Sequence, residues 1–96
     1  MVSVITNTGF ECTVDERKFA DFRVVDCCGV VLGDSDEMQK VVAATKLMHM
    51  IMNEKQIDDL CKHVEKDGVA STDDVFMELF DIMEKAKAEN SDVKKS

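Results

Sequence analysis

The chain has 96 residues, of which 20 are acidic and 12 are basic, so its formal net charge is −8. Hydrophobic residues make up 45% of the sequence, which is too many for a wholly disordered chain. This length allows one small domain that buries roughly 60–65% of its unfolded surface. The negative balance disfavours nucleic acid and membrane surfaces as partners, because both attract clustered Lys and Arg.

Two features argue against export and against a membrane anchor. No basic segment precedes an apolar run near the start, as a secretory signal would require. The longest apolar stretch elsewhere, residues 47–52, contains His49 and is far too short to cross a bilayer. We therefore expect a cytoplasmic protein.

The first third of the chain predicts a hairpin and a helix. Residues 2–14 form two alternating segments around Asn7, Thr8 and Gly9, which are residue types suited to a tight turn. The alternation predicts one face made of Ser3, Ile5, Phe10, Cys12 and Val14. A helix over 16–32 follows, with Asp15 as its N-cap.

The second helix is predicted over 36–52, and its apolar residues fall on two faces. The periodicity places a core stripe on one face, formed by Met38, Val41, Val42, Thr45, Met48 and Met52. The opposite face also becomes apolar towards the C-terminal end, and such a helix is either central to the core or covered by another chain. Both interpretations stay open here. In the second interpretation, the partner-binding residues are Leu47, Met50 and Ile51.

Two more helices complete the prediction. The third covers 54–66 and is closed by Asp67 and Gly68, which suit a left-handed cap. The fourth covers 72–88, after a capping-box pattern that starts at Ser71. Its inward residues are predicted to be Val75, Phe76, Leu79, Phe80, Ile82 and Met83. The fold class is therefore α+β, mostly α, with one domain over 1–89 and a disordered tail over 90–96.

The cysteines and histidines do not form a recognisable site. Cys12, Cys27, Cys28 and Cys61 lack the paired spacing of a structural zinc site, and buried small hydrophobes are the favoured interpretation. No catalytic triad, phosphate loop or carboxylate pair can be assembled from the sequence. We expect a non-enzymatic protein with no metal and no cofactor.

The order of these features resembles the small tail assembly chaperones of siphovirus-type phages and prophages, particularly those of Gram-positive hosts. The resemblance covers nearly the whole chain and rests on pattern and spacing. It is carried by the hairpin segment 8–15, by Asp21 and the run 24–26, by the Asp-Gly step in 65–70, and by Val75, Leu79, Phe80, Ile82 and the polar tail. Cys27–Cys28 and the methionine-rich helix end depart from that pattern.

The resemblance implies a protein that binds the tape measure protein, keeps it soluble and promotes assembly of the tail tube protein around it. Such proteins act in the host cytosol and are absent from the mature virion. We also expect this chain to associate with itself through Leu47, Met50 and Ile51. Many also have a longer form made by ribosomal frameshifting. The alternative is a small regulatory protein of mobile-element origin that binds one folded protein partner.

Overall fold

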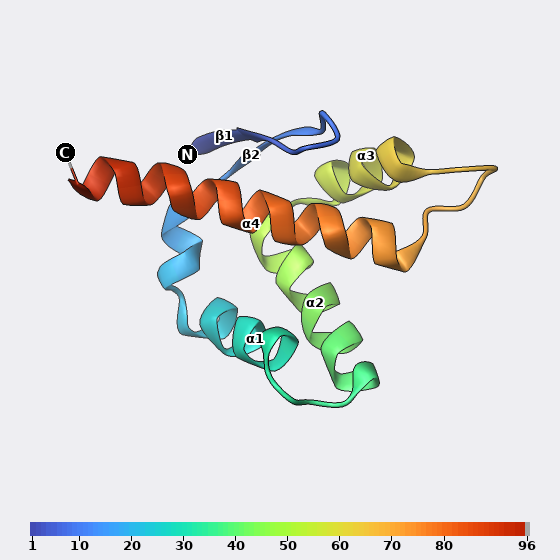
Figure 1. The fold of residues 1–96 in the computed structure, drawn as a ribbon, viewed down its shortest axis with the longest axis horizontal. Helices are drawn as coiled ribbons and strands as arrows, with labels where there is room; N and C mark the ends of the chain where they lie inside the picture. Colours follow the sequence, from blue (N-terminus) through green and yellow to red (C-terminus); the bar gives the residue numbers. More distant parts are fainter. Residues whose placement is uncertain (96) are drawn as a thin grey trace.

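The computed structural model describes the backbone of residues 1–95 and the side chains of residues 1–87. A two-stranded hairpin is followed by a short 3₁₀ helix and four α-helices (Figure 1). The α+β, mostly-α fold class is confirmed. In chain order the elements are β1 (Val2–Ile5), β2 (Glu11–Val14), η1 (Glu16–Ala20), α1 (Phe22–Leu32), α2 (Glu37–Ile51), α3 (Glu54–Val64) and α4 (Thr72–Lys95).

The hairpin has the predicted position, but the inward face of its first strand differs from the prediction. The strands pair antiparallel with Val2 opposite Val14 and Val4 opposite Cys12, and these four side chains face the core. Ser3 and Ile5, predicted on that face, are exposed. Side chains alternate along a strand, so a shift of one residue reverses the assignment of every side chain.

The helix predicted over 16–32 is two elements, because Asp21 interrupts it. The backbone of Asp21 is extended, with φ −70° and ψ 128°, and its carboxylate accepts a hydrogen bond from the backbone N–H of Arg23. Asp15 caps η1 in the same way, through Arg17. An aspartate can therefore start a new helix where apolar periodicity alone predicts continuation.

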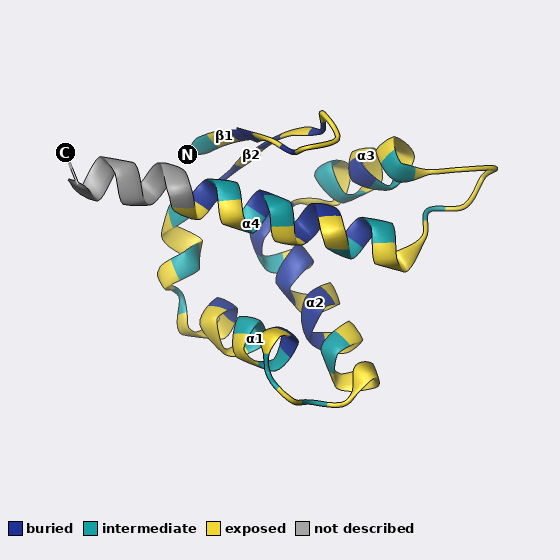
Figure 2. Ribbon diagram, in the orientation of Figure 1, coloured by how far each residue is buried: buried dark blue, intermediate teal, exposed yellow. Residues whose placement is uncertain are grey.

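The burial of α2 contradicts the predicted core stripe over its first half. Met38, Val41, Val42 and Thr45 are exposed, whereas Met48 and Met52 are buried as predicted. The residues that do face the core are Ala43, Ala44, Leu47, Met48 and Ile51. In Figure 2 the dark blue of buried residues is concentrated in the middle and C-terminal part of α2, while its N-terminal end is largely yellow and teal.

The segment between α3 and α4 is a tight turn and not a helix cap. α3 begins with a capping box between Asn53 and Gln56 and ends at Val64. Asp67 and Gly68 both have positive φ, 53° and 81°, and Lys66 and Val69 exchange two backbone hydrogen bonds around them. Positive φ at both central residues is the signature of a type I′ turn, for which Asp-Gly is a preferred sequence.

α4 begins at Thr72, as predicted, and its backbone continues to Lys95. The predicted boundary at residue 89 therefore falls inside this helix. The side chains of the predicted tail, residues 90–96, and the whole of Ser96 lie outside the described residues.

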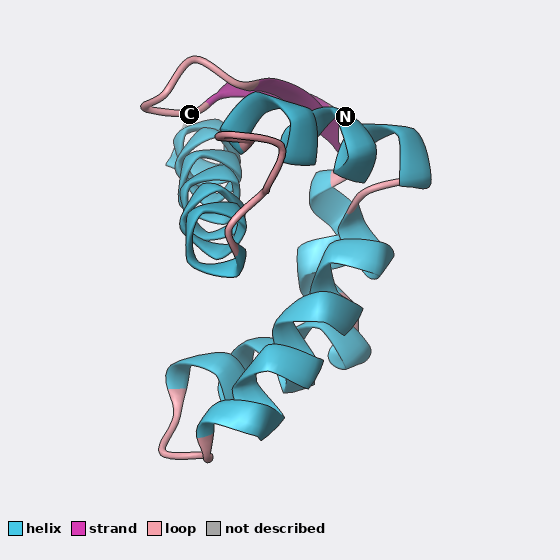
Figure 3. Cartoon of the chain, turned by 90° about the vertical axis from the view of Figure 1, so that its right-hand side faces the viewer, coloured by secondary structure: helices cyan, strands magenta, loops and turns pink. Residues whose placement is uncertain are grey.

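The elements form a body and a projecting pair of helices. The hairpin and α3 lie along α4, while α1 contacts mainly α2 and η1 (Figures 1 and 3). The buried side chains in the C-terminal half of α2 join one core cluster with the hairpin, α3 and α4, and the cluster extends to Val24 and Val31 of α1. We call residues 22–46, which comprise α1, the connecting loop and residues 37–46 of α2, the arm.

Candidate partner-binding surface

The three predicted partner-binding residues do not form an exposed patch. Leu47 has no exposed surface and Ile51 is 3% exposed, so both belong to the core. Met50 is half-buried against the same core, and its carbonyl oxygen accepts a hydrogen bond of 2.9 Å from Lys18 Nζ. Of the two interpretations of this helix end, the structure therefore supports the core, and Leu47 and Ile51 offer no surface to a partner in this conformation.

Six of the eleven large apolar side chains that are exposed among the described residues lie on the arm. Met38 is 73% exposed and Phe22 is 77% exposed, although both are large apolar residues. α1 buries only Val24 and Val31. A small protein exposes single apolar residues as a matter of course, but a concentration on one substructure is typical of an interaction site. The exposed apolar residues of the arm are Phe22, Val25, Leu32, Met38, Val41 and Val42.

A groove of about 460 Å³ lies between the arm and α4. One wall is the N-terminal half of α2 with Val31 of α1, and the other is the N-terminal part of α4. Its lining is mostly apolar, and its residues are Val31, Glu37, Met38, Lys40, Val41, Ala44, Thr72, Asp73, Phe76 and Phe80. We call it the α2–α4 groove.

Acidic side chains predominate at the N-terminal ends of both walls of the groove. Glu37 lies in the first turn of α2 and Asp73 in the first turn of α4. Asp36 caps α2 by accepting a hydrogen bond of 2.8 Å from the backbone N–H of Gln39. Lys40 is the one cation among the lining residues that the structure describes. The groove therefore combines an apolar floor with a moderately acidic rim.

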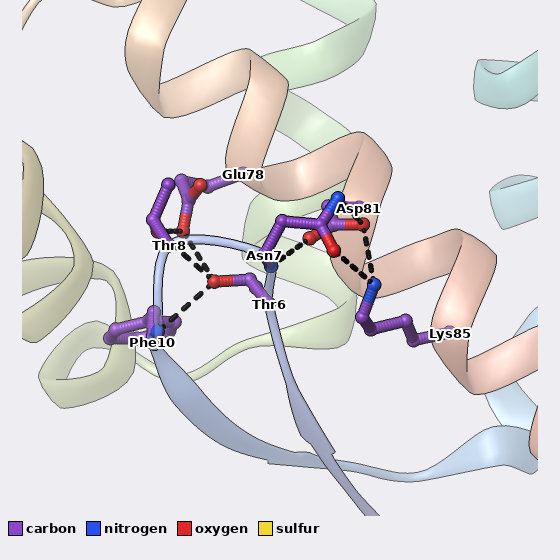
Figure 4. Close-up of polar contacts among 7 residues, drawn as sticks. All are labelled: Thr6, Asn7, Thr8, Phe10, Glu78, Asp81 and Lys85. Atoms are coloured by element: carbon purple, nitrogen blue, oxygen red, sulfur yellow. Dashed lines mark hydrogen bonds and ion pairs between the residues drawn. The ribbon is translucent and has the colours of Figure 1, made fainter.

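A polar network holds the hairpin turn on α4 and so positions one wall of the groove (Figure 4). The hydroxyls of Thr6 and Thr8 both donate to Oε1 of Glu78, over 2.8 Å and 2.7 Å. Glu78 is only 5% exposed, and the two hydroxyls satisfy the oxygen that it turns inward. Thr6 also accepts a hydrogen bond of 3.0 Å from the backbone N–H of Phe10.

A second part of the same network is ionic. Asp81 accepts a 2.6 Å hydrogen bond from the backbone N–H of Asn7, and Lys85 Nζ lies 3.0 Å from Asp81 Oδ1. Lys85 also donates to the side-chain oxygen of Asn7 over 2.9 Å. The backbone donor, with Lys85 beside it, lowers the pKa of Asp81 below its ordinary value. The carboxylate stays ionised and keeps the turn attached to α4.

His63 also contacts this network. Its Nε2 lies 3.0 Å from the hydroxyl oxygen of Thr8, and its ring packs against that of Phe10 at 5.4 Å between centroids. Because the Thr8 hydroxyl donates to Glu78, its oxygen can only accept here, so His63 Nε2 is the donor. This contact joins α3 to the hairpin turn.

The cysteines agree with the interpretation as small hydrophobes. All four are free thiols; Cys12 is buried, and the other three are half-buried against the core. Burial raises the pKa of Cys12 and Cys28 above the ordinary thiol value. Among the side chains of residues 1–87, no three His, Cys, Asp or Glu residues are grouped to hold a metal ion. None of the described helices combines the length and the apolar character needed to cross a bilayer.

Sequence reasoning missed Glu78 and the groove for different reasons. Glu78 falls on the inward stripe of α4, between Val75 and Ile82, and a carboxylate in such a stripe is a signal for a buried polar partner. The groove has no local signal, because its walls come from helices about 35 residues apart in the chain. Comparisons with protein-family models, curated proteins and solved structures found no match to this chain.

Proposed function

We propose that this protein binds other protein chains through the apolar surface of the arm, and that it is a tail assembly chaperone of a siphovirus-type phage or prophage. Protein binding through the arm is supported by the exposure of six large apolar side chains on α1 and α2. The role as a tail assembly chaperone is supported by the resemblance in sequence pattern. The client is the tape measure protein, and the outcome is assembly of the tail tube protein around it.

The composition suits a chaperone that keeps a sticky client in solution. An apolar surface covers the client's apolar side chains, and the net charge of −8 gives the complex an electrostatic repulsion that opposes aggregation. Such a protein acts in the bacterial cytosol, associates with itself while it waits for its client, and leaves before the virion matures.

Co-expression tests the proposal. A tape measure protein from a siphovirus of a Gram-positive host is produced with and without this chain, and its soluble fraction and co-purification are measured. We expect a soluble complex with the natural sequence and its loss in Met38→Asp, because that substitution puts a charge on the exposed arm. Val69→Asp is the matched control, since Val69 is 65% exposed and lies in the turn between α3 and α4.

Two results would contradict the proposal. Equal solubility of the tape measure protein with and without this chain would remove the chaperone role. Equal loss of the complex in Met38→Asp and Val69→Asp would show that the arm has no special part in binding.

A further inference from the structure

We infer that the α2–α4 groove takes one amphipathic helix of the partner protein, with Lys or Arg residues flanking its apolar stripe. This inference rests on the proposed protein-binding function and specifies the chemistry of the bound segment.

The shape and lining of the groove fit a helix. The wall residues span 37–44 on α2 and 72–80 on α4, which at 1.5 Å per residue is about 12–14 Å, or a little over two helical turns. Two turns present apolar side chains at i, i+3 or i+4, and i+7 on one face. The floor that meets them is supplied by Met38, Val41, Ala44, Phe76 and Phe80.

The side chains of this floor can adapt to an inserted helix. Met38 is exposed, and its unbranched thioether fills irregular space, as methionines do on other helix-binding surfaces. Phe76 is half-buried and Phe80 is 38% exposed, so a partner would cover aromatic area that the isolated chain leaves in water. Aromatic side chains of this kind contribute much of the binding energy at protein interfaces.

The charge around the groove selects a basic helix over a second copy of this chain. Glu37 and Asp73 stand at the N-terminal ends of the two walls, and Lys40 is the one lining cation among the described residues. A second copy whose own groove met this one would place Glu37 and Asp73 of the two chains near each other, an unfavourable like-charge contact that self-association through another face would avoid. A helix with cationic flanks instead gains attraction on approach and avoids like-charge contact once bound.

The groove exists before the partner arrives, which makes a rigid-body fit reasonable. The hydrogen bonds of Glu78 and Asp81 to the hairpin turn hold α4, and the buried C-terminal half of α2 holds the other wall. A preformed site does not have to be ordered on binding, so less of the interaction energy is lost.

A pair of designed peptides tests the inference on the full chain. Both are 14-residue helix formers with blocked ends and the same leucine stripe; one carries Lys and Arg beside the stripe and the other carries Glu. Binding is followed by fluorescence anisotropy at low and high salt. We expect the basic peptide to bind at least tenfold more tightly at low salt, with a preference that shrinks as salt rises.

Variants localise the binding. Met38→Asp and Phe80→Asp should each weaken the basic peptide at least tenfold, and circular dichroism verifies that they stay folded. The double variant Glu37→Lys, Asp73→Lys keeps the apolar floor and should abolish the preference for the basic peptide. Val69→Asp should leave the affinity unchanged.

The outcomes separate this inference from the proposed function. If the tape measure protein is captured but the two peptides bind equally, or neither binds, the inference is wrong and the proposed function stands. If the natural chain forms dimers that Met38→Asp dissociates and neither peptide competes with them, the groove belongs to a second copy and the inference is wrong. If neither client nor peptide binds, both fail.

Discussion

At the scale of single residues, Glu78 shows how a polar group can stand in an apolar stripe. It shares the inward face of α4 with Val75, Leu79 and Ile82, all of which are buried. Burial of a carboxylate without partners would oppose folding, but the hydroxyls of Thr6 and Thr8 donate to it. The hydroxyls on the hairpin turn and the carboxylate on α4 would each be unfavourable to bury alone. Their hydrogen bonds to each other remove that cost and join the turn to the helix.

Replacing this carboxylate should destabilise the protein. We expect Glu78→Ala to lower the free energy of unfolding by about 2–3 kcal/mol, because hydrogen bonds to a charged group are lost and two hydroxyls lose their acceptor. Urea denaturation followed by circular dichroism measures the change. Glu84→Ala, at an exposed position of the same helix, should change it by less than about 0.5 kcal/mol. Similar effects of the two substitutions would show that the network does not stabilise the fold.

At the scale of elements, Asp21 decides where one helix ends and the next begins. Its side chain accepts from the backbone N–H and from the guanidinium of Arg23, with 2.7 Å to the nearer guanidinium nitrogen. The guanidinium, followed by the backbone donor, lowers the pKa of Asp21 to about 2. The boundary is thus stabilised by the ionised form of one side chain.

This boundary makes stability depend on pH in a defined window. The carboxylate has its ordinary pKa near 3.9 in the unfolded chain and about 2 in the folded protein, so the unfolded state binds more protons between these values. The contribution of Asp21 is complete above about pH 4 and is lost as the pH falls towards about 2. Asp21→Asn keeps a capping side chain but cannot be protonated. We expect this variant to lose less stability between about pH 4 and pH 2 than the natural sequence does. Urea denaturation midpoints at each pH measure the difference. Parallel curves for the two proteins would refute this role.

At the scale of the whole molecule, α2 connects the arm to the body. Leu47, Met48 and Ile51 in its C-terminal half are buried in the core, while Met38, Val41 and Val42 in its N-terminal half are exposed. The two halves of this helix therefore differ in burial: Leu47 is enclosed by the core, while Met38 is exposed on the surface through which we propose that a partner binds. This division follows from where the helix passes and not from its composition.

A pair of substitutions on α2 tests the division. Leu47→Ala removes a fully buried side chain and should lower the free energy of unfolding by about 2–5 kcal/mol. Met38→Ala removes a similar volume from an exposed position and should change it by less than about 0.5 kcal/mol. Both are measured by urea denaturation at neutral pH. Comparable losses in the two variants would mean that the arm is packed more tightly than its exposure indicates.

Much of the fold was predictable because it depends on local signals. The turn around Gly9, the capping residue Asp15 and the start of α4 after Ser71 all place elements from short-range sequence. The Asp67–Gly68 step was predicted to be a special backbone position, but it forms a hairpin-like turn after α3 has already ended. The residue types Asp and Gly indicated positive φ at this position. Whether the position closes a helix or forms a separate turn depends on where α3 ends.

The sequence by itself determined the fold class, the acidic character and the amphipathic helices, because periodicity, capping and charge are properties of neighbouring residues. Only the tertiary structure decided which apolar residues are core and which are surface. α2 is apolar on two faces, so periodicity cannot choose between Leu47 and Met38. The choice depends on which half of the helix the hairpin, α3 and α4 enclose, and those contacts join segments far apart in the chain.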